Sequence, residues 1–299
     1  MNYKQQIEED KMNQIMERNI EYLNQLTEQM KSGQVSVFAG AGVSVASGYV
    51  DWKNLLKPIC KLLRLDINGD LTEIAQYYKN QYLVSMGYGY KLGIDLPGEN
   101  RGFLPNSEYY DKYHGKRWSS STVISIAIGQ GEVLATPLQI CNLAATIANR
   151  GYFITPHVVK EVQDTPLDSL YTDKRYTMVN RENYEIVAEG MRNAVIGGTC
   201  RGAAIPDIEV CGKTGTAENP HGKDHSAFIG FAPYRNPKVA ICVYVENGGF
   251  GATYGVPIGK LMMEKYLKGE ISEENKLLEE TMSNAVVSPN VLSLPNREL

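Results

Sequence analysis

Residues 209–217 read Glu-Val-Cys-Gly-Lys-Thr-Gly-Thr-Ala, and two segments rich in β-branched and aromatic residues follow at 226–231 and 239–245. Asn219-Pro220 and His221-Gly222 separate the first segment from the second, and Asn236-Pro237 precedes the third, so turns are expected between all three. The spacing predicts an antiparallel meander of three strands, with Lys213-Thr214-Gly215-Thr216 on the first.

The tetrapeptide contains Lys-Thr-Gly, one of three short elements of serine acyl transferases of the penicillin-binding and class A β-lactamase type. On an edge strand, Gly215 would let an extended peptide pair closely with the backbone. The Lys213 ammonium would favour the anionic forms of a nucleophile and of a substrate carboxylate. Thr214 and Thr216 would offer hydroxyls to that carboxylate, and the Thr216 N–H one half of an oxyanion hole. The alternative is a surface lysine on an amphipathic strand.

Of the other two elements of this enzyme class, Ser-x-x-Lys is absent from the sequence and Ser-x-Asn occurs only near its end. No Ser or Thr of the chain is followed at the third position by Lys. No residue therefore has the spacing that places a nucleophile and its activating amine on one helix face. The one Ser-x-Asn match, Ser288-Pro289-Asn290, lies in a polar tail and is a coincidence. We expect the chain to be catalytically incomplete.

Further short motifs surround the predicted strand. They are Gly87-Tyr88-Gly89, 92–99 (Leu-Gly-Ile-Asp-Leu-Pro-Gly-Glu), 102–105 (Gly-Phe-Leu-Pro), 126–132 (Ile-Ala-Ile-Gly-Gln-Gly-Glu), 136–139 (Thr-Pro-Leu-Gln), 148–151 (Ala-Asn-Arg-Gly) and 228–233 (Phe-Ile-Gly-Phe-Ala-Pro). In this order, residues 82–269 resemble the C-terminal part of the transpeptidase domain of the penicillin-binding protein 2 family.

The resemblance implies a mixed α/β fold, namely a partial β-lactamase-like transpeptidase fold with an antiparallel sheet and helices. It implies serine-type D,D-transpeptidase activity in cell-wall cross-linking. It also implies peptidoglycan stem peptides or β-lactams as ligands, elongation-machinery proteins as partners, no cofactor, and a membrane location facing the periplasm.

Two helices are predicted within this stretch. Thr136 and Pro137 form a helix start, and Gly151 after Arg150 marks its end. Its apolar face would consist of Leu138, Cys141, Ala144, Ala145 and Ala148. The second helix would run from 181 to 195 with Asn180 as its cap. Its core-facing residues would be Tyr184, Val187, Ala188, Met191 and Val195.

A different pattern occupies residues 34–48, where an alternating strand runs into a glycine turn. Such a turn can bring backbone amides close to a pyrophosphate. The residues expected to bind it are Gly40, Ala41, Gly42 and Ser44. Residues 20–80 resemble the first NAD-binding element of sirtuin-like domains, which implies NAD as a cofactor there. The proline usual in that family after Ser47-Gly48 is replaced by Tyr49.

The two resemblances predict a sirtuin-like, Rossmann-like fragment at 1–81, a transpeptidase-like domain lacking its nucleophile-bearing part at 82–269, and a polar tail at 270–299. Their families work in different compartments, so we expect a gene fusion or a chimera of two genes joined near residues 80–82, and we favour the chimera. The sequence shows neither a secretory signal nor an apolar stretch of about 20 residues. Expressed as printed, the chain would be cytoplasmic.

Composition narrows the function classes. A formal charge of −4 and an isoelectric point near 5.7 argue against a nucleic-acid surface. The five cysteines show no paired spacing, so neither a disulfide framework nor a metal cluster is expected. His221 and His225 flank a stretch broken by Pro220 and Gly222, which does not suit a metal site. A transpeptidase fragment, an NAD-binding or NAD-cleaving defence module and a non-catalytic vestigial chimera remain as hypotheses.

Overall fold

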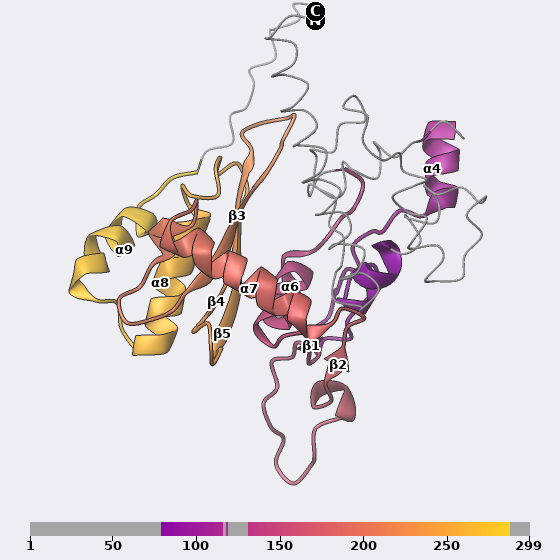
Figure 1. Cartoon of the computed structure of the whole chain (residues 1–299), viewed down its shortest axis with the longest axis horizontal. Helices are drawn as coiled ribbons and strands as arrows, with labels where there is room; N and C mark the ends of the chain where they lie inside the picture. The colour runs from indigo at the N-terminus through magenta and orange to yellow at the C-terminus, as the bar shows by residue number, and fades with distance from the viewer. Residues whose placement is uncertain (1–78, 116–117, 119–130, 288–299) are drawn as a thin grey trace, which may run out of the picture.

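The computed structural model describes residues 79–115, 118 and 131–287 (Figure 1). Its helices are α4 (Ser107–His114), α6 (Pro137–Ala148), α7 (Arg181–Ile196), α8 (Gly255–Lys268) and α9 (Lys276–Ser283). Its strands are β1 (Tyr152–Phe153), β2 (Arg175–Tyr176), β3 (Cys211–Ala217), β4 (His225–Ala232) and β5 (Val239–Val245). Short 3-10 helices are η3 (Ser169–Tyr171), η4 (Arg201–Ala203) and η5 (Glu273–Asn275), and residues 79–85 are also helical.

Strands β3, β4 and β5 form an antiparallel sheet in that order. Lys213 pairs with Ile229 and Thr214 pairs with Phe228. The predicted meander is confirmed, and so is the position of Lys213-Thr214-Gly215-Thr216 on its first strand. Strand β3 is an edge strand of the sheet among the described residues.

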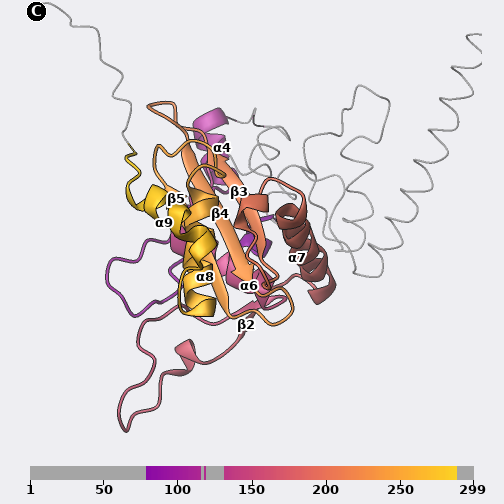
Figure 2. The same ribbon diagram turned by 90° about the vertical axis from the view of Figure 1, so that its left-hand side faces the viewer.

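Helices cover both faces of this sheet. Figures 1 and 2 show α8 against one face, α6 against the other, and α7 running beside β3. Because side chains alternate along a strand, β4 contributes to both layers. Phe228 packs with Val256 and Met263 of α8, whereas Phe231 packs with residues of α6 and α7. The sheet therefore joins two apolar clusters.

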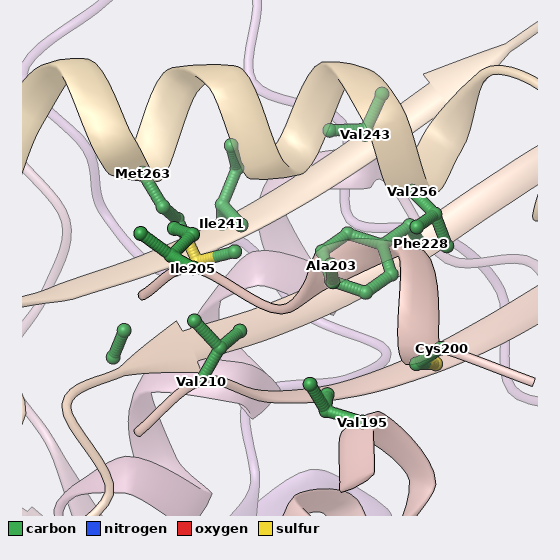
Figure 3. Packing of buried hydrophobic residues seen from close by; sticks show 11 residues of the cluster. Val195, Cys200, Ala203, Ile205, Val210, Phe228, Ile241, Val243, Val256 and Met263 are labelled. Atoms are coloured by element: carbon green, nitrogen blue, oxygen red, sulfur yellow. The ribbon is translucent and has the colours of Figure 1, made fainter. Parts of the chain in front are cut away.

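Phe228 is the centre of the cluster beneath α8. Figure 3 shows its ring next to Val256 and Ala203. The ring is fully buried, and glycines surround it. A Cβ at Gly212 would lie 2.5 Å from Phe228 Cε2, and a Cβ at Gly259 would lie 2.5 Å from its Cδ1. Such close packing leaves no space for a side chain at either position.

Helix α6 begins as predicted, although its buried face differs from the predicted one. The Thr136 hydroxyl accepts from the Gln139 N–H, and the Gln139 side chain accepts from the Thr136 N–H, which together form a capping box. Gln139 and Asn142 are buried, whereas Leu138 is only half-buried. Ala144 and Ala148 are buried as predicted. The prediction missed Gln139 and Asn142, because these polar side chains of α6 bind the backbone of the preceding segment.

Helix α7 agrees with its predicted range. Tyr184, Ala188, Met191 and Val195 are buried as expected, whereas Val187 is 39% exposed. Asn180 holds the N-cap position, but its side chain makes no capping hydrogen bond. Helix α8 was not predicted at all. The strand and glycine turn expected at 34–48 and the end of the polar tail after residue 287 lie outside the described residues.

Gln139 holds the segment 86–102 against α6. Its Nε2 lies 3.1 Å from Gly87 O, 3.3 Å from Tyr90 O and 3.1 Å from Arg101 O. The side chain is 2% exposed. Three carbonyl groups of a segment with little regular structure thus share one buried amide.

Two carboxylates of the motif 92–99 also bind backbone amides. Glu99 accepts from the N–H groups of Leu92, Gly93 and Ile94 at 2.6, 3.0 and 3.3 Å. Asp95 accepts from the amides of residues 158 and 159 at 2.8–2.9 Å. These hydrogen bonds hold the pKa of Asp95 below its ordinary value. The polar residues of the motif therefore fix two loops.

Candidate functional site

The candidate site is built on β3. Cys211 pairs with Phe231, which packs on α6 and α7, so strand alternation places Lys213 and Gly215 on that same face. Thr214 pairs with Phe228 and so lies on the face that α8 covers. The Lys213 side chain is exposed, and its Nζ lies 2.6 Å from Thr214 O. Strand β3 therefore presents an accessible ammonium beside an edge with which no other strand pairs in the part of the chain that the structure describes.

The middle of β3 lies against a loop that follows β5. A Cβ at Gly251 would lie 2.5 Å from the carbonyl oxygens of Gly215 and Ala227, so only glycine fits there. Ser226, at the start of β4, anchors the loop. Its hydroxyl donates to Phe250 O at 2.9 Å and accepts from Gly255 N at 3.1 Å. One serine thus ties β4 to the start of α8 and sets the position of the loop beside Gly215.

A turn after α7 contributes residues that sequence reasoning missed. Thr199 Oγ1 lies 2.9 Å from Thr214 Oγ1. The neighbouring Cys200 is fully buried, and its thiol contacts both hydroxyls and the Thr214 backbone. No local pattern indicates this contact, because Thr199 precedes Thr214 by 15 positions and lies outside any regular element.

Burial raises the pKa of the Cys200 thiol, although hydrogen bonds from Thr199 and Thr214 and the charge of Lys213 oppose the rise. Cys211 shows the same effect at the start of β3, where burial raises its pKa to about 12. Both thiols are therefore protonated at neutral pH. Neither is an activated nucleophile of the kind that a cysteine acyl transferase requires.

Other residues singled out from the sequence do not join this site. His225 begins β4, and its Nδ1 accepts from Asn247 N at 3.0 Å, which is a structural contact. Within residues 79–115, 118 and 131–287, no group of three or more His, Cys, Asp or Glu side chains is placed to hold a metal ion. The glycine turn with Gly40, Ala41, Gly42 and Ser44 lies outside the described residues. None of the described helices has the length and apolarity needed to cross a membrane.

Comparisons with known proteins agree on one family. The family model of the penicillin binding protein transpeptidase domain matches residues 4–264. Peptidoglycan D,D-transpeptidase MrdA of Acinetobacter baumannii is 32% identical over 246 residues, which cover 73% of this chain and 35% of that protein.

Two solved structures show the same likeness. The chain is similar to Pseudomonas aeruginosa PBP2 in complex with WCK 5153, with a TM-score of 0.59 and 32% identity over 69% of this chain and 46% of that one. It is also similar to a chain of the complex between PBP2 and MreC from Helicobacter pylori, with a TM-score of 0.51 and 30% identity over 62% of this chain and 34% of that one.

The chain spans 35–39% of the length of the first curated relatives that it matches. The family match includes most of the segment for which a sirtuin-like fragment was predicted. The comparisons therefore give no support to that fragment, to a chimeric junction near residues 80–82, or to an NAD site.

Proposed function

Because this chain belongs to the penicillin-binding protein transpeptidase domain family, we propose that it carries the peptide-binding side of a peptidoglycan D,D-transpeptidase site. In this proposal the domain extends to about residue 269, close to the end of the family match at residue 264. Its ligand is the carboxylate end of a peptidoglycan stem peptide, or a β-lactam that imitates it. Binding of this kind needs no cofactor.

The observation that carries the proposal is the position of Lys213-Thr214-Gly215-Thr216 on the edge strand β3. An extended peptide can add to such an edge through main-chain hydrogen bonds. The hydroxyls of Thr214 and Thr216, which share one face of β3, would donate to its terminal carboxylate. The Lys213 side chain starts on the other face, but its ammonium lies beside Thr214 O and would add a charge-assisted hydrogen bond, the stronger kind. The Thr216 N–H would supply one half of an oxyanion hole.

Acylation needs more than this strand. The reaction class uses a serine that a lysine activates from the same Ser-x-x-Lys element, and the printed sequence contains no such element. In our proposal the chain therefore binds the peptide and does not form an acyl-enzyme. The residues that would orient the ligand are present, whereas the attacking group is not supplied by this sequence.

The test separates binding from acylation. The full chain is titrated with a diacetyl-Lys-D-Ala-D-Ala tripeptide and followed by NMR, and in parallel it is incubated with a fluorescent penicillin and run on a denaturing gel. We expect saturable peptide binding, a loss of at least about fivefold in affinity for Lys213→Ala, and no covalent band. A covalent band would show that a nucleophile was missed.

The matched control is Lys223→Ala, which removes an exposed lysine from the turn between β3 and β4. It should bind the tripeptide as the wild type does. Equal losses for Lys213→Ala and Lys223→Ala would mean that net charge alone attracts the peptide, and the absence of saturable binding by the wild type would sink the proposal.

Partners follow from the same family membership. PBP2 of Helicobacter pylori has been solved as a complex with MreC. We propose that the full-length protein of this family acts with an elongation-machinery protein of that type at the periplasmic side of the membrane. Co-purification of this chain with an MreC protein would test whether the residues present here are enough. For the NAD-binding hypothesis we have no supporting observation.

A further inference from the structure

The turn between α7 and η4 places a further hydroxyl, that of Thr199, at the proposed carboxylate site. Thr199 Oγ1 lies 2.9 Å from Thr214 Oγ1, and both residues remain accessible to solvent. We propose that Thr199 is a positioning residue whose hydroxyl donates a hydrogen bond to Thr214 Oγ1. This bond directs the Thr214 hydroxyl hydrogen toward the ligand carboxylate. This inference rests on the proposed function of β3.

A threonine hydroxyl has one proton to donate and two lone pairs to accept with. In the contact between Thr199 and Thr214, either oxygen can be the donor. A carboxylate only accepts hydrogen bonds. Thr214 can serve it only if its own proton is free, and so Thr199 must be the donor between the two hydroxyls when ligand is bound.

The turn that carries Thr199 is fixed by its surroundings. Cys200 N donates to Ala194 O at 3.0 Å, and a Cβ at Gly198 would lie 2.9 Å from Ala194 Cα. The Cys200 side chain is fully buried in the apolar cluster beneath α8. Because the backbone is held on both sides of Thr199, its hydroxyl is directed at Thr214 without a large loss of loop entropy on binding.

Two neighbouring side chains, Cys200 and Lys213, lie close to this pair of hydroxyls. The Cys200 thiol contacts both hydroxyls, but sulfur is a weak hydrogen-bond acceptor and a weak donor. Lys213 lies close enough to act on that thiol and offers only donors. The hydrogen bonds therefore run in one direction, from Thr199 to Thr214 and from Thr214 to the carboxylate. In such a series each hydrogen bond strengthens the next.

The test uses two ligands that differ only in the group that Thr214 would recognise. The full chain is titrated by NMR with a diacetyl-Lys-D-Ala-D-Ala tripeptide and with its C-terminal carboxamide. Thr199→Val removes the hydroxyl at nearly constant shape, and Thr199→Ser keeps it. Thr172→Val is the matched control, because Thr172 is an exposed threonine at the end of η3.

We expect Thr199→Val to weaken binding of the carboxylate tripeptide about three- to tenfold, the usual effect of one lost hydrogen bond. Its affinity for the carboxamide should stay at the wild-type value. Thr199→Ser should restore carboxylate binding, and Thr172→Val should change neither affinity.

Three results would count against the inference, in distinguishable ways. Unchanged carboxylate affinity in Thr199→Val refutes the role of Thr199 while leaving the proposed function intact. An equal loss for both ligands, together with a lowered Tm, shows that Thr199 only supports the fold. A wild-type chain that does not prefer the carboxylate over the carboxamide overturns the proposed function, and the role of Thr199 with it.

Discussion

Helix α6 contacts both the sheet formed by residues 211–245 and the segment 86–102. The two regions are held by different forces. The sheet is stabilised by alternating apolar side chains, and its centre is a phenylalanine enclosed by glycines. The segment is mostly irregular and is held by Gln139 and Glu99, whose side chains bind its backbone. Apolar burial therefore builds the strand that carries the site, while polar side chains shape the segments around it.

The largest test of this comparison removes the centre of the apolar cluster. Phe228→Ala should lower the free energy of unfolding by about 3–5 kcal/mol, because a fully buried ring is lost and the enclosing glycines cannot fill the cavity. Urea denaturation followed by circular dichroism measures the change. Phe250→Ala is the control, since Phe250 is 72% exposed and its loss should cost little. Similar losses for the two variants would mean that Phe228 is not central to stability.

The next test removes the buried amide that holds 86–102. Gln139→Ala should cost about 1–3 kcal/mol, because it leaves buried carbonyl groups without their donor and breaks the capping box of α6. Hydrogen exchange followed by mass spectrometry should show faster exchange in peptides covering 86–102 and little change in β4. Gln163→Ala, at an exposed position, should behave as the wild type. Faster exchange throughout the sheet would show that the two regions do not differ as described.

The same contrast explains what the sequence could predict. The three-strand meander at 209–245 was predicted correctly because strand alternation and turn residues are local signals. Helix α8 was missed because Gly255, Pro257 and Gly259 weaken its helical pattern. The close approach to Phe228 leaves no room for a side chain at 259 and little room at 255. The buried face of α6 was misjudged because Gln139 has its partners 38–52 positions away. The pairing of Thr199 with Thr214 is likewise a tertiary contact, which no periodicity indicates.

A polar contact of the same kind joins η5 to helix α8. Glu264 of α8 is fully buried and accepts from Ser272 Oγ at 2.7 Å and from Asn275 Nδ2 at 2.8 Å. Burial alone would raise the pKa of Glu264, but these hydrogen bonds and the one from Lys268 outweigh it and lower the pKa. The contribution of this carboxylate to stability is therefore complete above its unfolded-state pKa and is lost as the pH falls through the folded-state value.

Glu264→Gln should accordingly lower the free energy of unfolding by about 1–2 kcal/mol at pH 7, and by less at a pH below both pKa values. Urea titrations at pH 7 and at acidic pH measure the difference. Glu279→Gln is the control, because Glu279 forms an exposed ion pair with Lys276 on α9, and such pairs contribute about 0–1 kcal/mol. A pH-independent loss for Glu264→Gln would show that the carboxylate is already protonated in the folded protein.

The smallest effect is expected at Asp95, an exposed carboxylate that also binds backbone amides. Its pKa is lowered chiefly by the amides of Val159 and Val158, so these contacts persist above the unfolded-state pKa and are lost as the pH falls through the folded-state value. The amide resonances of both valines should therefore shift with a midpoint below about 3.9, the ordinary value for Asp. Asp95→Asn should abolish this titration with little change in global stability, whereas Asp173→Asn, another exposed aspartate, should leave it in place. Where the fold depends on apolar burial, losing an exposed polar contact should affect only its own surroundings. If Asp95→Asn destabilised the sheet as strongly as Gln139→Ala does, the loop at 158–159 would instead belong to the structural core.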